Sequence, residues 1–246
     1  MKLVFLRHAD PDYAHDSLTP LGEKESQALA SFLQSKRIDY VYCSPLGRAR
    51  ETCRAYLRAA GRADVVVLEW LQEFRGLARK KLLPGASCAW NLSPDDYEED
   101  EKLYSALTWQ EAELWKKGPG EDTPKLAQEA FGGLDALLAE HGYPREGLHY
   151  AAERPNEDVL AFFCHYGILT YLIAHLTNLS PTLLAQATSA LPASVTVLYS
   201  EERDPGKASW RIQTYGSIAH LEAEGIVSTS GNGPEVAEEG KEAAAW

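Results

Sequence analysis

The sequence predicts an α/β fold in three layers, an α/β/α sandwich whose mostly parallel sheet lies between two layers of helices. Short apolar runs typical of buried strands alternate along the chain with longer segments of helical periodicity. A chain of 246 residues also has the length at which one substantial core is usual. We therefore expect a single domain over residues 1–227, with an inserted cap at 79–122 and an acidic, mobile tail at 228–246.

Six runs are predicted as strands because they are short, apolar and rich in β-branched or aromatic side chains. They cover residues 2–7, 39–43, 64–68, 159–164, 194–200 and 209–214. Four helices are predicted from apolar residues at helical spacing. The first has Thr19 as N-cap and Pro20 at its first position, where a missing N–H is tolerated. The second helix is predicted to begin at Ser44 and to end near Gly61. The third and fourth are predicted over residues 123–142 and 166–178.

Residues 79–122 break this alternation and are predicted to form a helical insertion. The segment is polar, acidic and rich in Trp and Tyr. We expect Trp90, Trp109 and Trp115 to be packing anchors of the insertion, with contact to substrate as the alternative. Substrate specificity is expected to lie in this segment.

The net charge of −12 comes from two stretches, which excludes a basic face for nucleic acid. Residues 94–122 contribute −7 and residues 221–246 contribute −5, which leaves twenty acidic and twenty basic residues elsewhere. A nucleic-acid backbone needs a basic stripe, and the sequence has none. No apolar stretch has the length of a membrane span. Arg7 interrupts the first apolar run after four residues, too early for a secretion signal.

The four cysteines predict a reduced, cytoplasmic protein without a metal centre. Cys43, Cys53, Cys88 and Cys164 have neither CxxC nor other metal-ligand spacing. Cys43 and Cys164 end apolar runs, where a reduced cysteine behaves as a small hydrophobic residue. The sequence does not indicate an oligomeric state.

Three of the predicted strands lead into residues suited to binding an anion. Arg7 and His8 follow the first strand, Arg48 lies in the first turn of the second helix, and His165 follows the fourth strand. The carboxyl ends of parallel strands form the ligand crevice of open α/β sheets, so we expect these side chains to meet there. Two guanidinium and two imidazole groups at one edge favour an oxyanion, above all a phosphoryl group.

Each group is suited to a step of phosphoryl chemistry. A neutral His8 is a nucleophile, and the charges of Arg7 and Arg48 oppose its protonation. A guanidinium fork matches two phosphate oxygens, and the helix start adds free N–H groups beside Arg48. His165 can donate hydrogen bonds to charge that develops on the transferring group.

A leaving alkoxide needs a proton, and Glu73 is our candidate general acid. It follows the strand at 64–68, and a phosphate dianion nearby would raise the pKa of its carboxyl. Glu69, Glu51 and Asp10 are rivals that sequence spacing does not exclude.

Five motifs, taken in order along the chain, resemble those of the histidine phosphatase superfamily, whose members are phosphoglycerate mutase-like. They are Leu6-Arg7-His8-Ala9, Leu18–Gly22, Ser44–Thr52, Glu73 and His165-Tyr166-Gly167. The resemblance spans residues 3 to 200, and the ordered set is more specific than any one motif. It implies the phosphoglycerate mutase-like form of the α/β sandwich.

For the site, the resemblance implies a covalent route. His8 becomes a phosphohistidine in a phosphate pocket formed with Arg7, Arg48 and His165, and water then hydrolyses the phosphoenzyme. Glu73 protonates the leaving group. No metal or other cofactor is implied.

The chain departs from the usual family pattern at two positions. Glycine usually follows the first histidine, whereas this chain has Ala9, a small change that we expect to be tolerated. A small residue is common after the second histidine, whereas here it is Tyr166. Its backbone N–H still serves in phosphate binding, and its ring is expected to narrow or line the pocket. Asp10–Asp16 and the acidic insertion also lack the long substrate-gripping segments of the mutase branch.

We therefore expect a histidine acid phosphatase-type phosphomonoesterase that hydrolyses a small phosphorylated metabolite. The alternatives are a phosphoglycerate-type mutase and a non-catalytic phosphate-binding module, with a phosphohistidine or phosphotyrosine protein phosphatase as a weaker one. A protein that only binds phosphate needs no general acid, so the presence of Glu73 argues against the non-catalytic module. The acidic insertion repels acidic partners, which favours a small-molecule phosphate ester, with neither nucleic acid nor membrane as partner.

Overall fold

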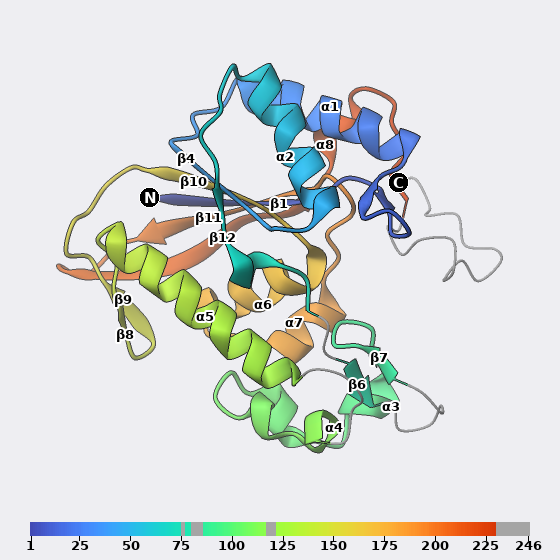
Figure 1. Ribbon diagram of the computed structural model, residues 1–246. Helices are drawn as coiled ribbons and strands as arrows, with labels where there is room; N and C mark the ends of the chain where they lie inside the picture. Colours follow the sequence, from blue (N-terminus) through green and yellow to red (C-terminus); the bar gives the residue numbers. More distant parts are fainter. Residues whose placement is uncertain (75–76, 80–85, 117–121, 230–246) are drawn as a thin grey trace.

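The three predicted layers are present in the fold (Figure 1). The computed structural model describes residues 1–74, 77–79, 86–116 and 122–229. One face of the sheet is covered by α1 (Pro20–Gln34), α2 (Gly47–Ala59) and α8 (Ala219–Glu222). The other face is covered by α5 (Thr123–Glu140), α6 (Tyr166–Thr177) and α7 (Pro181–Ala187).

Among the described residues, the main sheet has eight strands in the order β5-β4-β10-β1-β11-β12-β9-β8. Their bounds are β1 (Lys2–Arg7), β4 (Tyr40–Cys43), β5 (Val66–Val67), β8 (Arg145–Glu146), β9 (His149–Ala151), β10 (Val159–Cys164), β11 (Val195–Glu201) and β12 (Lys207–Ser217). Neighbouring strands are parallel from β5 through β4 and β10 to β1. From β1 onward, through β11, β12, β9 and β8, each strand is antiparallel to the one before it in this order. All six predicted strands are present, and the predicted fold class is confirmed. β8 and β9 are too short to give a periodic signal.

Alternate side chains of the central strand β1 enter two apolar cores. Leu3 and Phe5 pack in the layer of α5 and α6. Val4 and Leu6 pack in the layer of α1 and α2. A strand buried on both faces has an uninterrupted apolar sequence, which explains why this run could be recognised without alternation.

The first helix begins where predicted, and the second begins later. The hydroxyl of Thr19 accepts a hydrogen bond from the N–H of Gly22 at 3.1 Å and caps α1. The predicted start of the second helix at Ser44 is wrong, because α2 begins at Gly47. The N–H of Ser44 donates to the carbonyl of Phe163 at 2.9 Å, which keeps the chain extended beside β10 for one more residue.

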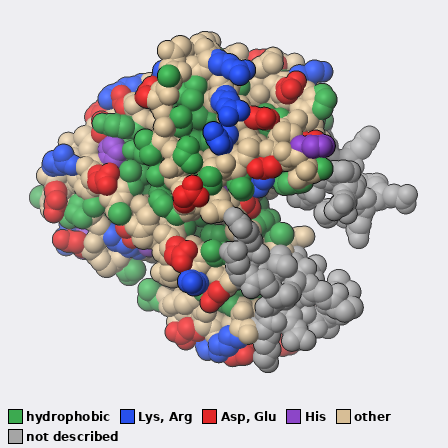
Figure 2. All heavy atoms as spheres, in the orientation of Figure 1, with side chains coloured by type: hydrophobic (Ala, Val, Ile, Leu, Met, Phe, Trp, Pro, Cys, Tyr) green, Lys and Arg blue, Asp and Glu red, His purple; other side chains and the backbone are tan. Residues whose placement is uncertain are grey.

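Helical spacing separates the arginines of α2 into two groups. Arg50, Arg54 and Arg58 are four residues apart and exposed, in agreement with the basic side chains seen over α2 in Figure 2. Arg48 lies off this face and is only 9% exposed. The 3.6-residue period therefore turns one arginine inward, toward the ends of the strands.

The insertion forms an additional layer beyond α5, α6 and α7 (Figure 1). It contains the hairpin of β6 (Leu77–Arg79) and β7 (Ala86–Cys88), the helices α3 (Pro94–Tyr97) and α4 (Glu113–Lys116), and 3-10 turns at Glu101–Tyr104 and Trp109–Glu111. Trp109 is 1% exposed and packs edge-on against Phe131, Tyr171 and Trp115. Trp109 and Trp115 are thus packing anchors, as expected.

Two smaller segments lie near the ends of the strands. The hairpin of β2 (Pro11–Asp12) and β3 (Ser17–Leu18) follows β1. At the other end of the described chain, the hydroxyl of Thr229 donates to the carboxylate of Asp10. The predicted mobile tail otherwise lies outside the described residues. No helix in the described part of the chain has both the length and the apolar character that a membrane crossing requires.

Candidate functional site

The ends of β1, β10 and β4 bring the predicted site residues to one edge of the sheet. β1 and β10 are in parallel register through Arg7 and Cys164. The N–H of His8 then donates to the carbonyl of Cys164 at 2.9 Å, and Ser44 makes the matching bond to Phe163 on the other side of β10. The side chains that follow these strands therefore start side by side, as predicted.

Two imidazole rings lie at the centre of this edge. The ring centroids of His8 and His165 are 5.0 Å apart, with their planes inclined by 56°. Nδ1 of His8 lies 2.8 Å from the carbonyl oxygen of Ala9. Since a carbonyl only accepts, Nδ1 carries the proton and Nε2 keeps its lone pair. Nε2 of His165 lies 2.7 Å from the hydroxyl of Ser44.

Both imidazoles are neutral at pH 7. Burial lowers the pKa of His8 well below 6.5, and the charges of Arg7 and Arg48 lower it further. Burial likewise lowers the pKa of His165, followed by the effects of His8, Arg48 and Arg7. The sequence predicts the effect of the two arginines on the pKa of His8, and in the structure burial has the larger effect.

The two arginines are buried, and hydrogen bonds to neighbouring residues hold their guanidinium groups in place. Arg7 is 7% exposed, and its Nη1 donates to the carbonyl of Ala190 at 2.7 Å. Its guanidinium carbon lies 5.7 Å from the ring centroid of Tyr166. Nη1 of Arg48 donates to the carboxylate of Asp16 at 2.6 Å. Each guanidinium group is therefore held in a defined orientation.

Asp16 is a residue of this site that the sequence analysis did not single out. Its second carboxylate oxygen accepts from the N–H of Gly47 at 2.6 Å, at the start of α2. Asp16 has a φ of 47°, a left-handed conformation that aspartate tolerates better than most residues. A Cβ atom at Gly47 would lie 2.0 Å from the carbonyl oxygen of Asp16, so only glycine fits there. A loop residue of this kind gives no periodic signal in sequence.

Glu73 lies against the first turn of α6. Its carboxylate accepts hydrogen bonds from the N–H groups of Gly167, Ile168 and Phe74, each at 3.0 Å. Such bonds favour the charged form. Burial nevertheless raises the pKa of Glu73 above 4.5, against these bonds and the charge of Arg48. The group is thus closer to protonation than an ordinary glutamate, as an acid at neutral pH requires.

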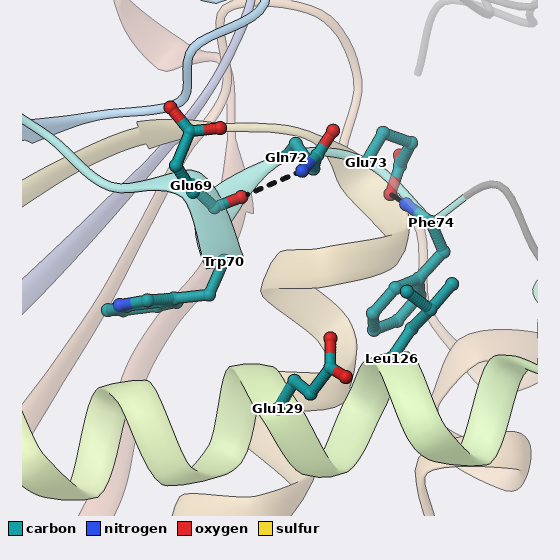
Figure 3. Close-up of a pocket in the computed structure, with 7 residues that line it drawn as sticks. All are labelled: Glu69, Trp70, Gln72, Glu73, Phe74, Leu126 and Glu129. Carbon is teal, nitrogen blue, oxygen red and sulfur yellow. Dashed lines mark hydrogen bonds between the residues drawn. The ribbon is translucent and has the colours of Figure 1, made fainter.

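Geometry separates Glu73 from the three rival carboxylates. Of the four, all described, Glu73 alone lines the same cavity as His8. Glu51 and Asp10 accept hydrogen bonds from the loop that precedes α1. Glu69 lies in the 3-10 turn at Glu69–Leu71 and lines only a second cavity of about 430 Å³ between that turn and α5, which Glu73 also borders (Figure 3).

The candidate residues open onto a cavity of about 650 Å³. Arg7, His8, Arg48, Glu73 and Tyr166 line it. The ring of Tyr166 lines the cavity as expected, and its hydroxyl is fixed within 2.9 Å and 2.5 Å of two backbone carbonyls near the end of α7. The other described walls come from Tyr13 of the β2–β3 hairpin, from Phe74, from the end of α7 with the segment after it, and from residues 88–92 of the insertion.

Nδ1 of His165 and Nε of Arg48 are buried nitrogen atoms of the site without a hydrogen-bond partner among the described residues. Buried polar atoms are nearly always paired in proteins, so atoms of this kind point to a ligand. His165 itself is 0% exposed and does not line the cavity, so it lies deeper than the sequence analysis implied.

The cysteines and the carboxylates do not form a metal centre within the described residues. All four cysteines are free, and Cys88 lines the cavity. In the same part of the chain, no group of three or more His, Cys, Asp or Glu side chains is arranged to hold a metal ion.

Comparison with known proteins identifies the fold and the family. The sequence model of the histidine phosphatase superfamily (branch 1) matches residues 3–213. The complex of mycobacterial glucosyl-3-phosphoglycerate phosphatase with inorganic phosphate is 22% identical, with a TM-score of 0.57, over 89% of this chain and 98% of that chain. A variant of phosphoserine phosphatase from Entamoeba histolytica, bound to phosphoserine, is 17% identical, with a TM-score of 0.57, over 89% and 98%. At these identities the likeness shows a shared fold. No curated protein matches the chain.

Proposed function

Because the chain belongs to the histidine phosphatase superfamily, we propose that it is a phosphomonoesterase that hydrolyses a small phosphorylated metabolite through a phosphohistidine on His8. One observation carries this proposal. A neutral imidazole with a free Nε2 lone pair lines the same cavity as two guanidinium groups and a carboxyl group of raised pKa. A nucleophile, an anion pocket and an acid are together what transfer of a phosphoryl group to histidine requires.

In the first step, Nε2 of His8 attacks phosphorus while the ester P–O bond breaks. Arg7 and Arg48 bind the oxygens of the transferring group. His165 lies behind His8, with ring centroids 5.0 Å apart, and its Nε2 accepts from the Ser44 hydroxyl, which leaves the proton on Nδ1 as a further donor. The leaving oxygen takes its proton from Glu73. His8 keeps its own proton on Nδ1, shared with the backbone, so the bond to phosphorus forms without prior deprotonation.

In the second step, water attacks the phosphohistidine. Glu73, now a carboxylate, accepts a proton from the water molecule, and Nε2 of His8 leaves phosphorus with its lone pair. The products are an alcohol from the first step and inorganic phosphate from the second. Glu73 ends protonated, ready for the next cycle.

Hydrolysis is favoured over phosphoryl transfer between positions of one substrate. The two related structures described above are phosphatases by name. The acidic insertion also lacks the substrate-gripping segments expected of a mutase. We place the protein in the cytoplasm, a setting that its four free cysteines support.

A panel of phosphorylated metabolites tests the proposal, with released phosphate measured by malachite green. We expect His8→Ala to abolish release while circular dichroism and thermal unfolding stay those of a folded protein. His149→Ala, at a histidine of β9 outside the cavity, is the matched control and should keep wild-type activity. Full activity of His8→Ala contradicts the proposal. Exchange between phosphoglycerate isomers without phosphate release would instead identify a mutase.

The acid role of Glu73 has a separate test. Glu73→Gln should lower kcat for alkyl phosphates by about 100-fold or more, the usual contribution of general acid catalysis. p-Nitrophenyl phosphate, whose leaving group scarcely needs a proton, should lose less than about tenfold. Equal losses for the two substrates remove Glu73 from this role.

A further inference from the structure

Residues 88–92 of the insertion form one wall of the cavity that contains His8. Trp90 is the largest side chain of this wall and is half-buried. Trp109 is fully buried, whereas Trp90 packs against the core and also lines the cavity, so it is both a packing residue and a wall of the candidate site. The insertion therefore contributes an aromatic surface directly to the candidate site.

The ring of Trp90 borders the candidate acid. A Cβ atom placed on Gly167 would lie 2.3 Å from Cζ3 of Trp90 and 2.7 Å from Oε1 of Glu73. The indole edge and the carboxylate therefore meet at the same point, over the first turn of α6. Tyr166 holds the ring from a second side, with the ring centroids 6.5 Å apart and the planes at 88°. The indole of Trp90 therefore lies close to the carboxyl group that is the candidate proton donor to the leaving oxygen.

The wall is fixed to the core by Gln186 of α7. Nε2 of Gln186 donates to the carbonyl of Ala89 at 3.2 Å, and its Oε1 accepts from the N–H of Leu92 at 2.9 Å. These two bonds hold the backbone on both sides of Trp90. The aromatic surface is thus formed before any ligand binds, which lowers the entropy that a ligand must lose.

Charge in the described lining is confined to the groups that act on phosphate. These are Arg7, Arg48 and Glu73, and the other described lining residues are uncharged. Beside Trp90 the described wall offers apolar groups from Leu92 and Leu191, amides from Asn91 and Gln186, and hydroxyls from Thr188 and Ser189. Apart from the three groups that act on the ester, this described lining holds no side chain of opposite charge for a carboxylate or an ammonium group on the leaving alcohol, and a desolvated charge without a counter-charge is disfavoured.

We propose that Trp90 determines specificity and that the substrate is the phosphate ester of an uncharged, ring-shaped alcohol whose flat face lies on the indole. An aromatic ring or the C–H face of a sugar ring satisfies this chemistry. The inference rests on the proposed function, since it names the leaving group of the same reaction.

Binding of three phosphonates tests the inference without turnover. Methylphosphonate carries the head group alone, phenylphosphonate adds a neutral ring and phosphonoacetate adds a carboxylate. By isothermal titration calorimetry, phenylphosphonate should bind about tenfold more tightly than methylphosphonate, the value of one good aromatic contact. Phosphonoacetate should bind no more tightly than methylphosphonate. Equal binding of the phenyl and methyl compounds, or tightest binding of phosphonoacetate, overturns the inference.

Variants assign the preference to the indole. Trp90→Ala should remove the advantage of phenylphosphonate while methylphosphonate affinity stays within about twofold, and Trp90→Phe should keep most of the advantage. Tyr104→Ala removes an exposed aromatic side chain of the insertion that does not line the cavity, and it should behave as wild type. If Trp90→Ala weakens all three phosphonates equally, the ring is structural and the inference fails.

Hydrolysis rates for different phosphate esters distinguish an aromatic ring from a sugar ring. Phenyl phosphate and a hexose 6-phosphate should both show higher kcat/KM than phosphoserine, and whichever is higher identifies the ring. Preference for phosphoserine overturns the inference. Failure of the proposed function can be told from failure of the inference about Trp90. If methylphosphonate does not bind, the proposed function is contradicted. If the phosphonates bind without preference for a ring, only the role of Trp90 is contradicted.

Discussion

Burial holds His8 and His165 neutral, and this state predicts a defined loss of stability in acid. The pKa of each imidazole is well below 6.5 in the folded protein and returns to about its ordinary value on unfolding. The stabilising contribution is therefore fully present above pH 6.5. It is lost as the pH falls toward the depressed folded values, because the unfolded chain then binds protons that the folded chain does not.

The size of the effect follows from proton counting. Each histidine that is protonated only in the unfolded state lowers the free energy of unfolding by about 1.4 kcal/mol per pH unit. Two such groups give about 2.7 kcal/mol per unit, a large share of the 5–15 kcal/mol typical of a domain. Glu73 acts with the opposite sign, because its pKa is raised. Its stabilising contribution is present below 4.5 and is lost as the pH rises through the raised value.

His8→Asn isolates one of the two protons. An asparagine amide can still donate to the carbonyl of Ala9, so the fold should persist, but it does not titrate. The slope of unfolding free energy against pH, from urea denaturation between about pH 6 and pH 5, where the unfolded histidine is largely protonated, should fall by about 1.4 kcal/mol per unit. His149→Asn, at a half-buried histidine outside the cavity, is the matched control for loss of one imidazole. A His8→Asn slope equal to that of the wild type refutes the neutral, buried imidazole.

Two further substitutions test the groups that support the site. Asp16→Ala should raise KM for phosphate esters by about fivefold, because Arg48 loses a charge-assisted partner; that partner is 42% exposed, so its worth is about 1 kcal/mol. An unchanged KM would show that Arg48 is oriented by other contacts. Trp109→Ala should lower the free energy of unfolding by about 3–5 kcal/mol, since the side chain is 1% exposed and packs on Tyr171 of α6. A loss below about 1 kcal/mol in urea denaturation would show that the insertion does not depend on this anchor.

Features that depend only on nearby residues, such as strand ends, helix periodicity and helix caps, could be predicted from the sequence. The apolar run before Arg7 ended at the edge where parallel strands place ligands, so the meeting of Arg7, His8, Arg48 and His165 could be predicted. The glycine of the His165-Tyr166-Gly167 motif has a local reason too, because the indole of Trp90 occupies the space that a Cβ atom would need. Periodicity and capping chemistry were enough for these features.

The remaining features depend on contacts between distant segments. The choice of Glu73 over Glu69 follows from which of the two carboxylates reaches the cavity that contains His8, and spacing does not encode this. The bond from Asp16 to Arg48 joins two loops through a left-handed residue. Ser44 was expected to begin a helix, but its pairing beside β10 kept it extended. In each case tertiary structure decided between local options of similar energy.

Direct detection of the phosphorylated enzyme tests the central claim. A phosphate ester labelled with ³²P should be mixed with the enzyme and quenched in base during turnover, because phosphohistidine is stable in base and labile in acid. Peptide mapping should place the label on His8, and His8→Ala should take up none. Label on another residue, or turnover with no labelled protein at any time point, would contradict the claim that this imidazole accepts the phosphoryl group.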